Sequence, residues 1–219
     1  TNSRLNILDK VLLSSYPRSG NSFVRNLLEG STGLITGSDS RSNRTLTSAL
    51  LQCGFRGEGI LDESVWCIKS HFPERMGYRR FVAKRCILLV RNPFDSILSY
   101  FHMGFTNSHD RVLTPSAMSS EALQKIWPKF VLEEAAVWRR FHDYWHECSR
   151  DLPILVVRFE DVMQDSDTAV DLMTNFIQKD FETPVKMSTN SNDLLEDNSV
   201  FAETTTKASN PNVLLPGPG

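Results

Sequence analysis

The chain has 219 residues, of which 40% are hydrophobic and 23% charged, and its formal net charge is -2 at pH 7. This composition is typical of a globular protein and is sufficient for one large α/β domain with its own core. Because the net charge supplies no general basic field, we expect no nucleic-acid partner, and membrane association only through an anchor outside this sequence. The four cysteines form no C-x-x-C pair, so we also expect no metal.

Apolar runs alternate with helix-type patterns along most of the chain. We predict strands at 11–15, 65–68, 86–90 and 154–158, helices at 21–29, 44–52, 93–105, 128–149 and 166–178, and loops at 31–43, 54–64 and 107–118. This alternation indicates an α/β fold with a P-loop-like parallel sheet and helices on both faces. We assign this domain to residues 1–185, and we expect the Ser/Thr/Asn-rich segment 186–219 to be a mobile tail.

The clearest chemical signal lies where the first predicted strand, 11–15, turns into the first helix. Free backbone N–H groups and the positive end of the helix dipole favour anions at such a turn, and we predict Ser19 as the N-cap. Arg18 adds a permanent cation, and Ser19 and Ser22 add hydroxyl groups. The turn therefore predicts a cradle for a phosphate-like group. It is not a Walker A loop, because the G-x-x-x-x-G-K-[ST] spacing is absent.

Polar side chains also follow the other predicted strands. The three segments are Lys69-Ser70-His71, Arg91-Asn92-Pro93 and Phe159-Glu160-Asp161. Because ligands of open parallel sheets bind beyond the carboxyl ends of the strands, we expect these segments to share one edge with the first turn. Arg91 is suited to a second anion site, since a guanidinium makes a two-pronged contact with phosphate.

These segments, taken in order, resemble the sulfotransferases that use 3'-phosphoadenosine 5'-phosphosulfate (PAPS), and are closest to the WSC-domain-containing and carbohydrate-type members. Residues 16–23 resemble the 5'-phosphosulfate loop, and residues 91–100 resemble the 3'-phosphate motif. Residues 69–73 are similar to the Lys-Thr-His segment that carries the base, and residues 159–161 to the Tyr-Glu-Asp segment. The resemblance covers about residues 10–180 and implies the sulfotransferase fold.

The resemblance implies an enzyme that moves a sulfonate group from PAPS, without a metal, to a hydroxyl-bearing acceptor such as a carbohydrate or another small molecule. The implied nucleotide-binding residues are Arg18, Ser19, Gly20, Asn21, Ser22, Phe23, Arg91 and Ser99. In the implied chemistry His71 is the general base, Lys69 holds the sulfonate, and Arg18 stabilises the leaving phosphate.

Three points stay open at the level of sequence. Glu29, on the first predicted helix, is an alternative base, and we interpret His102 and His109 as structural. The resemblance favours the Golgi lumen, although the cytoplasm also fits. The basic Arg-Lys-Gly segment of the family is not found, since Lys207 is the one basic residue within 198–210.

That departure keeps two other functions in view. One is a non-catalytic nucleotide-binding protein of the same fold. The other is a nucleotide-dependent phosphotransferase, which the missing Walker lysine disfavours.

Overall fold

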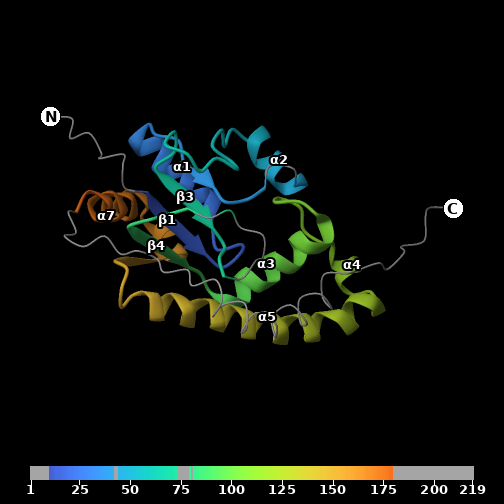
Figure 1. Ribbon diagram of the computed structural model, residues 1–219. Helices are drawn as coiled ribbons and strands as arrows, with labels where there is room; N and C mark the ends of the chain where they lie inside the picture. Colours follow the sequence, from blue (N-terminus) through green and yellow to red (C-terminus); the bar gives the residue numbers. More distant parts are fainter. Residues whose placement is uncertain (1–9, 42–43, 74–78, 80, 180–219) are drawn as a thin grey trace. The chain divides into compact units, whose positions relative to one another are not determined.

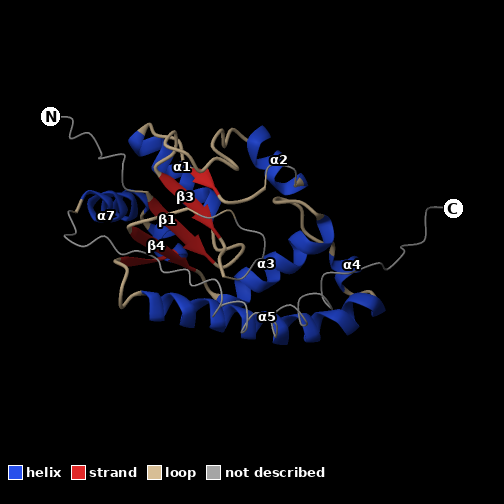
Figure 2. Ribbon diagram, viewed as in Figure 1, coloured by secondary structure: helices blue, strands red, loops and turns tan. Residues whose placement is uncertain are grey.

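The computed structural model describes residues 10–41, 44–73, 79 and 81–179, and its centre is a five-stranded sheet (Figures 1 and 2). The strands are β1 (Val11–Ser15), β2 (Gly37–Ser38), β3 (Cys67–Ser70), β4 (Arg85–Val90) and β5 (Ile154–Arg158). Their order is β2-β3-β1-β4-β5, and all four pairings are parallel. The predicted α/β fold with a parallel sheet is therefore confirmed.

Two details of the sheet differ from the prediction. Residues 31–43 were predicted as a loop, but they contain β2, which at two residues is too short to show a period in the sequence. The second predicted strand, 65–68, is wrong by two residues, because β3 extends from Cys67 to Ser70. Lys69 therefore lies inside a buried strand rather than after it.

Seven helices are found in the described part of the chain. They are α1 (Asn21–Thr32), α2 (Thr45–Gln52), α3 (Pro93–Thr106), α4 (Pro115–Met118), α5 (Glu121–Cys148), α6 (Phe159–Gln164) and α7 (Ser166–Gln178). The prediction that Pro128 opens the long helix is wrong, because α5 begins seven residues earlier and carries this proline internally. Residues 159–161 begin α6 rather than closing the strand, and α4 lies within the predicted loop 107–118.

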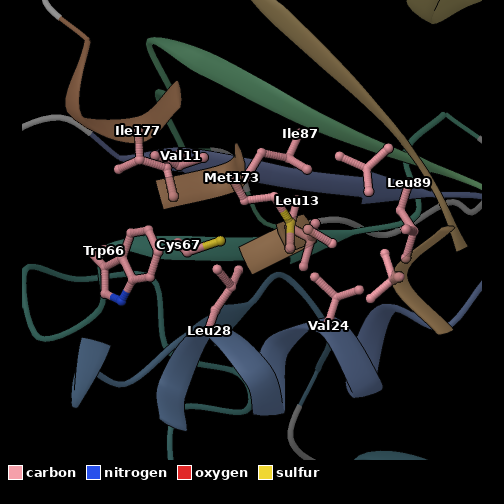
Figure 3. Close-up of a cluster of buried hydrophobic side chains, with 13 residues drawn as sticks. Val11, Leu13, Val24, Leu28, Trp66, Cys67, Ile87, Leu89, Met173 and Ile177 are labelled. Carbon is pink, nitrogen blue, oxygen red and sulfur yellow. The ribbon is translucent and has the colours of Figure 1, made fainter. Parts of the chain in front are cut away.

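One face of the sheet is buried by α1, α6 and α7 (Figure 3). Leu13 of β1 and Ile87 of β4 meet Leu28 of α1 and Met173 of α7 in a continuous apolar cluster. Alternate strand residues face the same side, which is why these positions recur at every second residue. Cys67 belongs to this cluster, and burial raises the pKa of its thiol to about 12.

The long helix α5 runs along the other side of the sheet, next to α3 (Figure 1). Tyr16, directly after β1, donates a hydrogen bond of 2.5 Å from its hydroxyl to Glu134 of α5. Trp145 of α5 donates from Nε1 to the Phe72 carbonyl oxygen at 3.0 Å. These bonds attach α5 to the chain where it leaves β1 and β3, so the helix supports the edge of the sheet at which the candidate site lies.

The predicted mobile tail, 186–219, and the stretch 198–210 that lacks the basic motif lie outside the described residues. Among the residues that are described, no helix combines the length and the apolar character needed to cross a bilayer. The same residues contain no cluster of three or more His, Cys, Asp or Glu side chains that could hold a metal ion.

Candidate functional site

A cleft of about 550 Å³ lies at the carboxyl ends of the central strands. Of the predicted site residues, the cleft is lined by Arg18, Gly20, Asn21, Ser22, Phe23, Lys69, His71 and Arg91. Two predicted nucleotide-binding residues, Ser19 and Ser99, are not among its lining residues. The topology thus brings three of the four predicted strand-end segments to one concave surface, and residues 159–161 are not among its lining residues.

The turn between β1 and α1 has an unusual backbone. Arg18 has φ 65° and Gly20 has φ 89°. Both values lie in the left-handed region, which residues other than glycine rarely adopt. A Cβ atom at Gly20 would lie 2.2 Å from the ring of Phe159, so the close approach of α6 also requires glycine. The turn is therefore fixed both by its own geometry and by the aromatic ring packed against it.

The prediction that Ser19 caps α1 is wrong, because Gly20 is the N-cap and no side chain caps the helix. The left-handed turn moves the helix start one residue further along the chain. The Ser19 Oγ is buried and has no hydrogen-bond partner among the described residues. The first N–H groups of a helix lack intrahelical partners, so this uncapped end presents donors for an anion.

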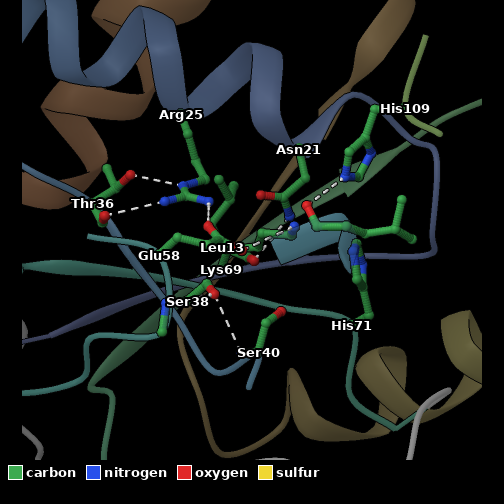
Figure 4. Close-up of polar contacts among 12 residues, drawn as sticks. Leu13, Asn21, Arg25, Thr36, Ser38, Ser40, Glu58, Lys69, His71 and His109 are labelled. Carbon is green, nitrogen blue, oxygen red and sulfur yellow. Dashed lines mark hydrogen bonds and ion pairs between the residues drawn. The ribbon is translucent and has the colours of Figure 1, made fainter. Parts of the chain in front are cut away.

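Asn21 holds the start of α1 onto β1 (Figure 4). Its Nδ2 donates to the Leu13 carbonyl oxygen at 3.2 Å and to the Ser15 Oγ at 3.0 Å. The amide group of this predicted nucleotide ligand thus fixes the turn, although the residue also lines the cleft.

Two arginines from different strand ends lie close together. Arg91 donates from Nη1 to the Arg18 carbonyl oxygen at 2.8 Å, and its guanidinium carbon is 4.8 Å from the centroid of the Phe159 ring. Arg18 donates from Nε to the Ser99 Oγ at 2.9 Å and from Nη2 to the His109 carbonyl oxygen at 2.8 Å. Burial, together with the charge of Arg91, lowers the pKa of Arg18. Ser99 therefore binds Arg18, whereas the sequence paired it with Arg91.

His71 is oriented by the backbone of the first strand. Its Nδ1 is 2.7 Å from the Ser15 carbonyl oxygen, which can only accept a hydrogen bond. In the neutral ring Nδ1 therefore carries the proton, and the basic lone pair is on Nε2. This tautomer is the one that a general base at this position needs.

Lys69 is 6% exposed and lies at the end of a buried charge network, shown in Figure 4. Its Nζ is 3.9 Å from the Glu58 Oε1, and the Glu58 Oε2 is 2.5 Å from the Arg25 Nη1. Burial by itself would raise the pKa of Glu58, but the charges of Lys69 and Arg25 outweigh it and hold the pKa below its ordinary value. The network places the Lys69 ammonium group at the cleft, with a buried carboxylate close to it.

The alternative base, Glu29, has a different environment. Its Oε1 accepts hydrogen bonds from the Thr36 backbone N–H at 2.9 Å and from the Thr36 Oγ1 at 2.5 Å. Glu29 is not among the residues that line the cleft. The structure thus gives this carboxylate a role in holding the chain that leads to β2.

Asp39 and His109 are among the residues that line the cleft but that sequence reasoning missed. Asp39 follows β2, and its Oδ2 accepts a hydrogen bond from the Ser70 Oγ at 2.6 Å. Burial raises the pKa of Asp39 to about 6. We interpreted His109 as lying elsewhere, but its Nδ1 is 3.3 Å from the Arg18 Nη1. Neither residue belongs to a recognisable sequence motif. Asp39 reaches the cleft because it follows the two-residue strand β2, and His109 reaches it through a contact with Arg18, which is far away in sequence.

Phe23 is 39% exposed at the cleft, and its ring packs edge-on against Phe159 at 6.2 Å between centroids. Glu160 accepts a hydrogen bond from the Asn92 backbone N–H at 2.9 Å, which connects α6 to the turn after β4. Phe159 and Glu160 therefore hold three of the four strand-end segments together.

The profile of one family, described as the sulfotransferase domain, matches residues 8–213 of this chain. A WSCD family member of Drosophila melanogaster is 29% identical over 174 residues, which cover 76% of this chain and 49% of that protein. Sulfotransferase 1B1 of the dog, Canis lupus familiaris, is 23% identical over 191 residues, covering 81% of this chain and 62% of that enzyme.

Among solved structures, mouse sulfotransferase SULT7A1 complexed with PAP is similar with a TM-score of 0.49 and 18% sequence identity, covering 93% of this chain and 68% of that one. The chain spans about half the length of the Drosophila relative.

Proposed function

Because this chain belongs to the sulfotransferase family, we propose that it transfers a sulfonate group from PAPS to an acceptor hydroxyl. The observation that carries the proposal is the uncapped start of α1, which lines the same cleft as Arg18, Arg91, Lys69 and His71. One concave surface thus offers two sites for anions and a correctly oriented base.

In this proposal the 5'-phosphosulfate binds the first turn of α1. The N–H groups of its first residues and the Ser19 hydroxyl, which lacks a partner among the described residues, are available as donors. Arg91 supplies the second anion site for the 3'-phosphate, Ser99 accepts a hydrogen bond that positions the Arg18 side chain, and the exposed ring of Phe23 supplies a surface for adenine. A nucleotide with two separated anionic groups fits this arrangement better than a simple phosphate ester.

The proposed reaction is an in-line displacement at sulfur. The acceptor oxygen attacks sulfur, the bond between sulfur and the bridging phosphate oxygen breaks, and His71 takes the hydroxyl proton at Nε2. Lys69 contacts the sulfonate oxygens, and Arg18 stabilises the charge that develops on the leaving 3'-phosphoadenosine 5'-phosphate (PAP). PAPS is the co-substrate, and none of these steps needs a metal.

We retain a carbohydrate as the proposed acceptor and the Golgi lumen as the proposed compartment. Both rest on the resemblance of the motifs to WSC-domain-containing and carbohydrate-type members. In addition, the cleft is lined by polar side chains that suit an acceptor with several hydroxyl groups, namely Asp39, Thr45 and Thr47.

Calorimetry with PAP, and separately with ATP and Mg²⁺, tests the nucleotide part of this proposal. We expect binding of PAP and a clear preference for it over ATP, because the 3'-phosphate has a site of its own. A preference for ATP with Mg²⁺ would instead favour a phosphotransferase. PAP binding without sulfonate transfer to any sugar or alcohol acceptor would favour a non-catalytic nucleotide-binding protein. The sequence leaves that alternative open because residues 198–210 lack the basic Arg-Lys-Gly segment of the family.

A transfer assay with labelled PAPS tests the base. His71→Ala is expected to lower the rate about 10²- to 10⁴-fold, which is the usual contribution of a general base, while PAP affinity changes little. His146→Ala is the matched control, since this histidine is exposed on α5 and does not line the cleft. Full activity of His71→Ala would remove the assignment of the base.

A further inference from the structure

His109 makes three contacts that join two walls of the cleft. It lies shortly after α3, whose C-cap is Asn107. Its Nδ1 is 3.3 Å from the Arg18 Nη1, and its backbone carbonyl oxygen accepts from the Arg18 Nη2 at 2.8 Å. Its Nε2 is 3.1 Å from the carbonyl oxygen of Leu46 in α2. The imidazole ring thus lies between α2 and the arginine of the β1–α1 turn.

The chemistry of these neighbours selects one form of the ring. A carbonyl oxygen can only accept, so the Nε2 of His109 must carry a proton. A guanidinium can only donate, so Nδ1 must present its lone pair to Arg18. Both contacts are made together only by the neutral ring with its proton on Nε2. Protonation of Nδ1 would replace a hydrogen bond by the repulsion of two cations.

The surroundings of His109 act in the same direction. Burial lowers the pKa of His109, and the charges of Lys69 and Arg18 lower it further, against opposing contributions from Glu58 and from the hydrogen bond to Leu46. Asp110, the next residue, is a further charged group that interacts with the ring. The neutral form required by the contacts is therefore also the form that the environment favours.

We propose that neutral His109 is a positioning residue that holds the Arg18 guanidinium at the nucleotide site and connects it to α2. The link to a nucleotide rests on the proposed function, in which Arg18 contacts the phosphosulfate. The contact with Arg18 itself does not depend on that function. The competing interpretation is that His109 binds the anion directly in its protonated form.

Nitrogen-15 NMR of the histidine rings, recorded on the full chain without nucleotide from pH 5 to pH 8, tests the geometry. We expect His109 to show the Nε2–H tautomer and to titrate below the ordinary histidine value. In Arg18→Met, which removes the donor and its charge, we expect the His109 pKa to rise and the Nδ1 shift to change. An Nδ1–H tautomer, or a titration that Arg18→Met leaves unchanged, would overturn the proposal.

Calorimetry with PAP at pH 7.5 tests the effect on the nucleotide site. His109→Ala is expected to weaken binding only about 5-fold, because the lost hydrogen bond to Arg18 is long, at 3.3 Å, and the bonds of Arg18 to Ser99 and to the backbone of residue 109 remain. His109→Asn is expected to bind within about 2-fold of the wild type, because its amide oxygen can accept from Arg18 where Nδ1 did. His146→Ala again serves as the control.

Two results of this titration contradict the positioning role. One is equal weakening in the Asn and Ala variants. The other appears when the calorimetry is repeated at lower pH: tighter PAP binding by the wild type as His109 becomes protonated, lost in His109→Asn, would indicate direct anion binding. If the wild type does not bind PAP at all, the proposed function fails, and the NMR experiment still decides whether neutral His109 holds Arg18. Circular dichroism of each variant verifies that it is folded.

Discussion

The β1–α1 turn and the wall formed by Asp39, α2, Glu58 and His109 line the same cleft but are held in different ways. The turn consists of contiguous residues whose backbone is fixed by left-handed angles and by the ring of Phe159. The wall is assembled from segments far apart in sequence, and its contacts are hydrogen bonds and ion pairs made by side chains, some of them to backbone carbonyl groups. For example, the bond from His109 to Leu46 spans 63 residues.

This difference separates two kinds of sensitivity. In the turn, replacing Gly20 by a residue with a side chain strains the backbone, and this strain does not depend on pH. In the wall, Asp39, Glu58 and His109 are ionisable groups with shifted pKa values. The effect of substituting them on stability or binding therefore depends on pH. Stability and binding measurements on matched variants of the two regions test whether the distinction holds.

The largest expected effect belongs to the buried charges of the wall. Glu58→Gln leaves Arg25 and Lys69 buried without their anionic partner, and removing one member of a buried pair typically costs about 3 kcal/mol or more of unfolding free energy. Glu133→Gln is the control, because its pair with Lys129 is exposed and should contribute less than about 1 kcal/mol. Urea unfolding at pH 7 measures both. Similar small losses in the two variants would mean that the network does not hold the wall.

A large loss is also expected in the turn. Gly20→Ala combines a disfavoured positive φ with a clash against Phe159, and overpacking plus backbone strain should destabilise the protein by about 2–3 kcal/mol. The matched control is Gly30→Ala within α1, where an added Cβ atom would meet nothing within 4 Å. This substitution should raise the free energy of unfolding by about 0.5–1 kcal/mol, because alanine has a higher helix propensity than glycine. The loss in Gly20→Ala should be the same at pH 5 and pH 8. A strong dependence on pH would break the comparison between the two regions.

Substitution of Asp39 should give an effect no larger than that of Gly20→Ala, but one that changes with pH. Its folded pKa of about 6 lies above the ordinary value of 3.8, so the folded state binds the extra proton between these values and stability falls as pH rises through them. The shift corresponds to about 2–3 kcal/mol above pH 6. Asp39→Asn should therefore be more stable than the wild type at pH 7.5, with an advantage that disappears near pH 4. Parallel stability curves for the two proteins would contradict the raised pKa.

The smallest expected effect concerns the rim of the turn. Phe23→Ala should weaken PAP binding by about 1 kcal/mol, since one base stacked on an aromatic ring contributes about 1–3 kcal/mol and Phe23 is also packed against Phe159. Phe23→Trp should bind at least as tightly as the wild type. Calorimetry with adenosine 3',5'-bisphosphate, which is PAP, gives both values. Unchanged affinity in Phe23→Ala would assign the ring to packing alone.

The sequence by itself determined the fold class and the position of the turn between the first strand and the first helix. Strands 11–15 and 154–158 and helix 166–178 were predicted with the bounds that the structure has. This succeeded because apolar runs and helical periodicity are local properties of contiguous residues. Residues 16–23 are likewise contiguous, so their order already indicated a turn that presents donors to an anion.

Only the tertiary structure decided how the side chains of that cleft are paired. Ser99 accepts a hydrogen bond from Arg18, and Lys69 lies at the end of a buried charge network. Asp39 lies at the site because it follows the two-residue strand β2. His109 lies there because it contacts Arg18, which is 91 residues away in the sequence. Such pairings depend on which strand ends meet at one edge, and the folded sheet brings these ends together although they are far apart in sequence.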